Sequence, residues 1–94
     1  MESLSSLCLS ETRLTDVGLR GLGKLKRLAV LDISFTEITD AGVKDLVAHE
    51  ILSTLDVTAT QITDAGLREI VKVKNLSSLG LYGTKVTASG IQEL

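Results

Sequence analysis

The chain has 94 residues, of which 44% are hydrophobic and 23% charged, a composition typical of one soluble globular domain spanning 1–94. Its net charge of -2 argues against a general binder of nucleic acid. No apolar run is long enough to span a membrane, the start at Met1 lacks the pattern of a signal peptide, and a single cysteine, Cys8, excludes an internal disulfide. These features favour a cytoplasmic protein that binds neither nucleic acid nor membrane.

One pattern recurs every 24 residues, and a fixed period of this size indicates a stacked repeat in which each unit packs on its neighbours. The repeats cover residues 4–27, 28–51, 52–75 and, incompletely, 76–94. Their shared apolar positions are Leu4/Leu28/Leu52/Leu76, Leu7/Leu31/Leu55/Leu79, Leu9/Ile33/Val57/Leu81 and Leu14/Ile38/Ile62/Val86. Their shared threonines and glycines are Thr12/Thr36/Thr60/Thr84, Thr15/Thr39/Thr63/Thr87 and Gly18/Gly42/Gly66/Gly90. Such a chain is expected to be a scaffold that presents a surface.

Each repeat begins with apolar residues at alternate positions, which predicts a short strand. The strands are expected near residues 6–9, 30–33, 54–57 and 78–81. A threonine followed by an aspartate comes next. This pair is typical of a helix start, because the hydroxyl can cap free N–H groups and the carboxylate suits the positive end of the helix. Helices should begin near Asp16, Asp40 and Asp64, whereas the fourth repeat has Ala88 in that place.

One strand and one helix per repeat predict parallel strands joined by right-handed crossovers. Strands lie about 4.8 Å apart while packed helices need roughly 8–10 Å, so the helix layer is wider and the stack must curve. The predicted fold class is therefore α/β, a right-handed solenoid with a short parallel sheet on its concave side and helices on its convex side.

The spacing Leu-x-x-Leu-x-Leu-x-x-Thr-x-Leu, seen in residues 52–62, resembles the leucine-rich repeat family. The run Ile-Thr-Asp-Ala-Gly at 38–42 and 62–66 is similar to the cysteine-containing repeats of F-box proteins and to a threonine-bearing repeat of bacterial proteins. The threonines and the 24-residue length fit the second better. The family usually has asparagine or cysteine where this chain has Thr36 and Thr60. The resemblance implies that these threonines are buried, with hydroxyls bonded to the backbone of their own or a neighbouring repeat.

The two ends of the stack lack the polar caps that repeat proteins need to stay soluble. We expect Leu4, Leu7 and Leu9 at one end, and Ile91 and Leu94 at the other, to be covered by another chain or to form an apolar patch. The chain is then either a piece of a longer protein or a protein whose ends are covered by a partner. Self-association through the ends is one form of the second case.

Side chains that point out of the predicted sheet form the candidate binding face. The outward rows are Ser6/Val30/Thr54/Ser78, Cys8/Asp32/Asp56/Gly80 and Ser10/Ser34/Thr58/Tyr82, with Glu11/Phe35/Ala59/Gly83 beside them. Asp32 and Asp56 should lie side by side, so that a lysine or arginine from a partner would relieve their repulsion. Phe35 and Tyr82 are the only aromatic residues and neither falls in a core column, which makes them candidate anchors. The alternative for Phe35 is that it folds over the sheet edge.

No catalytic, cofactor-binding or metal-binding residue is predicted. His49 aligns with Leu25 and is interpreted as a helix-end residue with one ring nitrogen bonded to a nearby carbonyl. Cys8 falls on the opposite layer, which excludes a Cys–His pair. Asp32 and Asp56 alone are too few ligands for calcium. The repeated glycines stand singly and form no phosphate loop, so they are expected to allow close approach between helices.

These observations predict a non-catalytic protein-interaction module that binds a protein partner through its concave strand face. The proposed binding residues are Val30, Asp32, Phe35, Glu37, Asp56, Thr58 and Tyr82. One alternative is a structural segment that assembles through its uncapped ends. Another, implied only by the resemblance, is the substrate-recognition part of a ubiquitin-ligase adaptor, which would need an F-box segment that these residues do not contain. The basic helix side is interpreted as a solvated face, with a weak patch for an acidic partner as the alternative.

Overall fold

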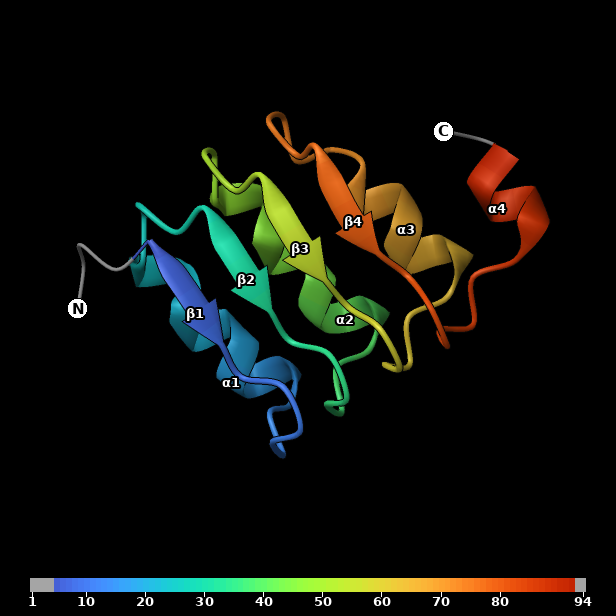
Figure 1. Ribbon diagram of the computed structural model, residues 1–94, viewed down its shortest axis with the longest axis horizontal. Coiled ribbons are helices and arrows are strands. Elements are labelled where there is room, and N and C mark those ends of the chain that lie inside the picture. Colours follow the sequence, from blue (N-terminus) through green and yellow to red (C-terminus); the bar gives the residue numbers. More distant parts are fainter. Residues whose placement is uncertain (1–4, 93–94) are drawn as a thin grey trace.

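The computed structural model describes residues 5–92 as strand–helix units stacked side by side (Figure 1). The strands are β1 (Ser6–Cys8), β2 (Val30–Asp32), β3 (Thr54–Asp56) and β4 (Ser78–Gly80). They form one parallel sheet in the order β1-β2-β3-β4, and each residue pairs with the residue 24 positions later, as Leu7 does with Leu31. The predicted strands are confirmed, although each ends one residue earlier than expected.

The helices begin where the threonine–aspartate pairs indicated. They are α1 (Asp16–Arg20), α2 (Asp40–Val43), α3 (Asp64–Ile70) and α4 (Ala88–Gln92), and the first two continue as the 3-10 helices η1 (Gly21–Lys24) and η2 (Lys44–Ala48). Thr39 and Thr63 cap α2 and α3, because their hydroxyls accept hydrogen bonds from the N–H groups of Ala41 and Ala65 at 3.3 Å.

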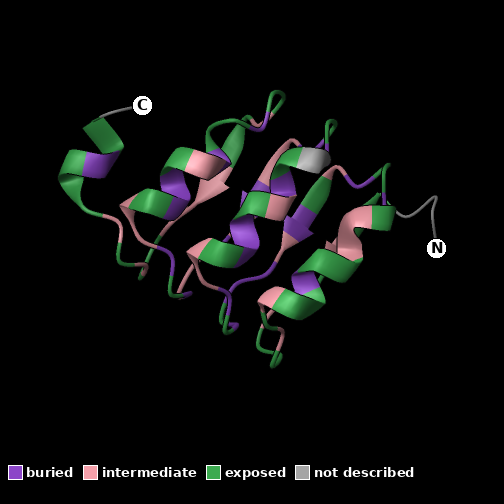
Figure 2. Cartoon of the chain, turned by 180° about the vertical axis from the view of Figure 1, so that it is seen from behind, coloured by how far each residue is buried: buried purple, intermediate pink, exposed green. Residues whose placement is uncertain are grey.

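The strands and helices form two layers, and β1 and α4 lie at opposite ends of the stack (Figure 1). Seen from behind, each α-helix carries both buried and exposed positions (Figure 2), as expected for a helix that packs one side on a sheet. The predicted α/β architecture is thus confirmed. The right-handed sense of the crossovers stays a prediction.

The apolar core is complete in the two inner repeats and open at the two outer ones. Leu31 and Leu55, on the inner strands, are 0% and 1% exposed. Leu19 and Leu25 of the first repeat are buried in this core, but the other apolar residues that pack on it from the outer repeats are only partly buried: Leu7, Leu9, Leu14, Leu22, Leu76, Leu79, Leu81 and Val86. Ile91, in α4, is 50% exposed. Of the predicted end patches, Leu4 and Leu94 lie outside the described residues.

The threonines predicted to be buried close a turn directly after each inner strand. Thr36 and Thr60 are 6% and 1% exposed, and their hydroxyls donate to the carbonyl oxygens of Ile33 and Val57 at 2.7 Å. The acceptor lies three residues earlier in the same repeat, so each hydroxyl holds its own turn rather than linking two repeats. The expected burial and backbone bonding are confirmed.

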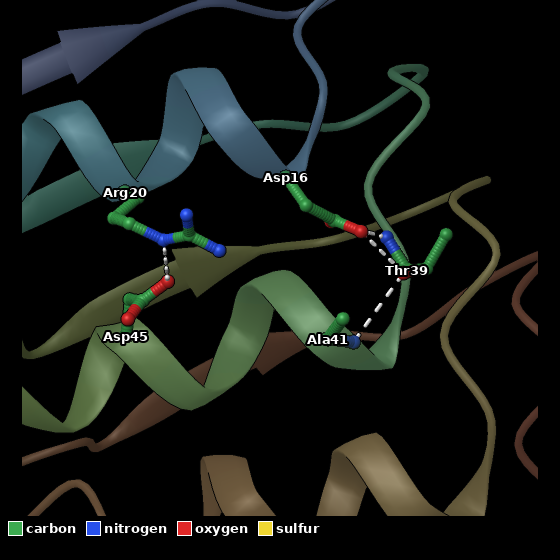
Figure 3. A network of polar contacts seen from close by, with 5 residues as sticks. All are labelled: Asp16, Arg20, Thr39, Ala41 and Asp45. Atoms are coloured by element: carbon green, nitrogen blue, oxygen red, sulfur yellow. Dashed lines mark hydrogen bonds and ion pairs between the residues drawn. The ribbon is translucent and has the colours of Figure 1, made fainter.

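Successive repeats are joined instead by the aspartates that open α1, α2 and α3, as Figure 3 shows for α1. The Asp16 carboxylate accepts two hydrogen bonds from Thr39 of the next repeat, one from its N–H at 2.8 Å and one from its hydroxyl at 2.5 Å. The same pair of bonds joins Asp40 to Thr63 and Asp64 to Thr87. From the sequence these aspartates were interpreted only as helix-start residues, so their role between repeats is a finding of the structure.

The repeated glycines make room for these carboxylates. A Cβ added at Gly42 would overlap Oδ1 of Asp16, and one added at Gly66 would overlap Oδ1 of Asp40. Gly90 stands in the same relation to Asp64. The predicted close approach between helices is therefore confirmed. The absence of a side chain at each glycine lets an aspartate of the preceding repeat lie against the helix backbone.

A buried histidine closes the second repeat. His49 follows η2, is 1% exposed, and makes a hydrogen bond with the backbone of Leu25, as predicted for a helix-end residue. Its other ring nitrogen, Nδ1, is buried without a hydrogen-bond partner. Burial is the main reason that the pKa of His49 is lowered from 6.5, so the folded protein holds the ring neutral.

Replacing Thr60 by valine should lower the free energy of unfolding by about 1–3 kcal/mol, because the buried Val57 carbonyl loses the hydroxyl donor at 2.7 Å and keeps only the Thr60 N–H at 3.2 Å. Thr12→Val is the matched control. Thr12 makes the same bond to Leu9 at 2.7 Å but is exposed, so water can replace the hydroxyl. Urea titration of both variants measures the difference. If both variants lose the same free energy of unfolding, burial of the carbonyl does not determine the cost of removing the hydroxyl.

Stability should fall as the pH drops below about 6.5, because the unfolded chain then binds a proton on His49 that the folded chain takes up only at lower pH. The loss is absent above this range and is complete below the lowered folded-state pKa. His49→Leu, which matches Leu25 in the first repeat, should remove this slope. Urea titrations between pH 5 and 7 measure it, and parallel curves for the two proteins would contradict the assignment.

Candidate functional site

The residues predicted to bind a partner lie on β2 and β3 or on the segments that follow β2, β3 and β4. In β2, Val30 and Asp32 flank the buried Leu31, because alternate side chains of a strand point to opposite faces. Val30 is 39% exposed, and Asp32 is partly exposed. We define the sheet face as Val30, Asp32, Phe35, Asp56, Thr58 and Tyr82, all of which are accessible.

Asp32 and Asp56 pair in the register of β2 and β3, as predicted. Oδ1 of Asp32 accepts hydrogen bonds from the N–H and hydroxyl of Ser34 at 3.0 and 2.6 Å, and Oδ2 accepts one from Sγ of Cys8 at 3.7 Å. The bond from the Ser34 hydroxyl is the main reason that the pKa of Asp32 is lowered, and partial burial opposes it. Hydrogen bonds from Ser34, in the same turn, and from Cys8, on β1, thus favour the ionised form of the Asp32 carboxylate.

Asp56 forms a similar turn but has its neighbour on the other side. Its Oδ1 accepts a hydrogen bond from the N–H of Thr58 at 2.9 Å. A Cβ added at Gly80 on β4 would lie 2.5 Å from this oxygen and 3.3 Å from Oγ1 of Thr58. Asp32 therefore contacts a side chain of β1, whereas Asp56 lies against the backbone of β4, so the two carboxylates engage opposite neighbours.

Phe35 and Tyr82 are both exposed, at 56% and 86%. Phe35 adopts a left-handed backbone with φ 55°, a conformation that is uncommon for a bulky residue. The equivalent residues of the other repeats adopt it too: Glu11 (φ 58°), Ala59 (φ 58°) and Gly83 (φ 72°). The turn after each strand therefore requires this conformation. Of the four residues only Gly83 signals it in the sequence.

One expected position differs from the structure, and one predicted binding residue lies apart from the others. Ser34, placed in an outward row with Thr58, is buried at 5% exposure, because its hydroxyl donates to Asp32 and the side chain is tucked into that turn. Glu37 is exposed as predicted, but it lies beyond the turn, in the segment that leads to α2, where its N–H donates to the carbonyl of Leu14 at 3.0 Å. Glu37 thus lies beside the sheet face rather than in its rows.

The other candidate residues do not come together. Cys8 is exposed on β1, while His49 is buried at the end of η2 in the helix layer. Within residues 5–92, no group of three or more histidine, cysteine, aspartate or glutamate side chains is placed to hold a metal ion. The helices described in that part of the chain are all too short or too polar to cross a membrane.

The repeats match a known family. A family described as Leucine Rich repeat matches residues 27–47 and again 50–71, which are two consecutive repeats of this chain. No curated protein sequence matches the chain significantly. Leucine-rich repeats generally mediate protein–protein interaction and typically are not catalytic. With its parallel strands in one sheet, each followed by a helix, the chain is a leucine-rich-repeat solenoid of the α/β class.

Proposed function

We propose that this chain binds a protein partner through the sheet face, without catalysing a reaction. The observation that carries the proposal is the exposure of both aromatic residues, Phe35 and Tyr82, on segments that follow β2 and β4. Aromatic side chains contribute large contact areas at low entropic cost and dominate the energetics of interfaces. Neither residue contributes to the apolar core, so folding does not account for them.

A rival surface lies on the helix side. Val47, Ile51 and Val71 are 37%, 47% and 49% exposed there, among exposed lysines and arginines. Valine is under-represented among residues that carry binding energy, whereas tyrosine is enriched. The sheet face is therefore the better candidate, and the helix side provides control positions.

The charge of the sheet face favours a partner with a basic side chain. Asp32 is held ionised by its hydrogen bonds, and both Asp32 and Asp56 stay partly exposed. The exposed Glu37, in the segment that leads to α2, adds a third carboxylate. Complementary charge of this kind sets orientation and association rate more than affinity. Because the two aspartates contact opposite neighbours, we propose that a basic group reaches one carboxylate at a time rather than a shared site between them.

Replacing Tyr82 by alanine should weaken binding about 30-fold, since truncation of an aromatic anchor costs about 2 kcal/mol. The change should not disturb the fold, because the side chain is 86% exposed. A protein captured from a lysate by the wild-type chain is identified, purified and titrated by calorimetry against each variant. Val71→Ala on the helix side, at 49% exposure, is the control and should bind as the wild type does.

The same titration separates charge from structure at Asp56. Asp56→Asn keeps an oxygen that can accept from the Thr58 N–H but removes the charge, whereas lysine would also break that turn. The asparagine variant should bind more weakly and respond less to salt. Lys44→Glu, an exposed change on the helix side, should have little effect. If Val71→Ala or Lys44→Glu weakens binding while Tyr82→Ala does not, the helix side is the binding surface and the proposal is wrong.

A further inference from the structure

The two aspartates of the sheet face differ in how much of their hydrogen-bonding capacity the protein itself uses. Asp32 accepts two hydrogen bonds on Oδ1 from Ser34 and one on Oδ2 from Sγ of Cys8. Asp56 accepts one on Oδ1, from the N–H of Thr58, and in the described part of the chain its Oδ2 has no hydrogen-bond donor. Asp56 therefore keeps more acceptor capacity for a partner than Asp32 does.

The hydroxyl of Thr58 adds a second acceptor next to Asp56. At the equivalent place in the preceding repeat, Ser34 is buried and donates its hydroxyl to Asp32. Thr58 is partly exposed, and its hydroxyl makes no hydrogen bond with any residue that the structure describes. A Cβ added at Gly80 would lie 2.5 Å from Oδ1 of Asp56 and 3.3 Å from Oγ1 of Thr58. The two side chains therefore meet beside Gly80, which has no side chain to cover them.

The exposed ring of Tyr82 lies on the next rung of the stack. The N–H of Ala59 donates to the carbonyl oxygen of Tyr82 at 2.8 Å, so Tyr82 neighbours Thr58 and Ala59 across the rungs. Neighbouring rungs are about 4.8 Å apart. An aromatic ring attracts a cation that lies within about 6 Å of its centre. A cation bound to Asp56 and Thr58 can therefore also contact the ring of Tyr82, which is 86% exposed.

Asp32 lacks such a neighbour. The residue that stands to Asp32 as Tyr82 stands to Asp56 is Thr58, two residues further along the strand of the next repeat. A carboxylate with unused acceptor capacity and an aromatic ring on the following rung thus occur together at Asp56 and not at Asp32.

These groups fit an arginine side chain better than a lysine side chain. The guanidinium is a planar cation with five N–H donors, so it can donate to two acceptors at once and stack on an aromatic ring. The ammonium of lysine is a compact and more strongly hydrated charge that cannot stack in this way. Asp56 supplies the opposite charge, Thr58 the neutral acceptor and Tyr82 the ring.

We propose that Asp56, Thr58 and Tyr82 form an arginine-binding site, and that the protein partner presents an exposed arginine to it. The guanidinium donates to Oδ2 of Asp56 and Oγ1 of Thr58, and it stacks on the ring of Tyr82 beside Gly80. This inference rests on the function proposed above, because it names the group of the partner that the sheet face recognises.

The probe is the capped tripeptide acetyl-Gly-Arg-Gly-amide, titrated into the isotope-labelled chain and followed by amide chemical shifts. The shifts should saturate with a Kd of about 1–10 mM and be largest at Asp56, Thr58, Gly80 and Tyr82. The tripeptide with lysine in place of arginine should bind about fivefold more weakly, because it cannot stack and bridge both acceptors. The tripeptide with citrulline, which has the shape of arginine without its charge, should cause no saturable shifts.

Three variants of the chain identify the groups that bind the arginine tripeptide. Asp56→Asn keeps the oxygen that accepts from Thr58 and should bind about fivefold more weakly, because the charge is lost. Tyr82→Leu keeps an apolar side chain without the ring and should bind about threefold more weakly. Glu50→Gln is the control. It removes an exposed carboxylate from the segment that leads to β3 and should bind as the wild type does.

The inference is overturned if the arginine tripeptide causes no saturable shifts at Asp56, Thr58 and Gly80 at about 30 mM. It is also overturned if the lysine tripeptide binds equally well, or if Asp56→Asn binds as tightly as Glu50→Gln. The proposed function is tested separately by the calorimetric titration of the captured partner. A partner that binds Tyr82→Ala weakly, together with an arginine tripeptide that does not bind, would support the sheet face as the binding surface and overturn the arginine site.

Discussion

The structure depends on one contact between neighbouring repeats, in which an aspartate of one repeat accepts hydrogen bonds from a threonine of the next. We call this contact the junction. Asp40 accepts two hydrogen bonds from Thr63, and Gly66 leaves the space that its carboxylate occupies. Each repeat is too small to bury its own apolar residues, so the spacing between repeats must be held for the core to close. The junction ties each helix to the turn that starts the next one, while the sheet ladder holds the strand side in the same 24-residue register.

This arrangement leaves the sheet face accessible. The threonine hydroxyls close the turns from within, the helix layer covers one side of the sheet, and the aspartates of the helix starts join the repeats. Asp32 is oriented by Ser34, and Asp56 by the Thr58 amide, so these carboxylates are positioned without a partner. Polar groups that are positioned before binding lose little entropy when a partner binds, which supports the function proposed for the sheet face.

The repeat period made most of the fold predictable. Alternating apolar residues located the strands, and the threonine–aspartate pairs located the helix starts at Asp16, Asp40 and Asp64. The sequence did not predict the role of these aspartates between repeats, because a threonine followed by an aspartate is also the usual pattern of a helix start. The recurring Thr-Asp-Ala-Gly run was the available signal. The left-handed turn at Phe35 and the burial of Ser34 could not be predicted, because three of the four turn residues are not glycine and a serine gives no sign of its partner.

A double-mutant cycle between Asp40 and Thr63 tests the central claim most directly, with Asp40→Ala, Thr63→Val and the double variant unfolded in urea. The solvent-accessible pair of Arg20 and Asp45 (Figure 3) is the reference cycle. Nε of Arg20 and Oδ2 of Asp45 lie 3.6 Å apart, and the coupling of this pair should be below about 1 kcal/mol. The junction predicts a coupling of about 1–3 kcal/mol between the aspartate and the threonine hydroxyl. A value no larger than that of the reference pair would show that apolar packing alone holds the repeats together.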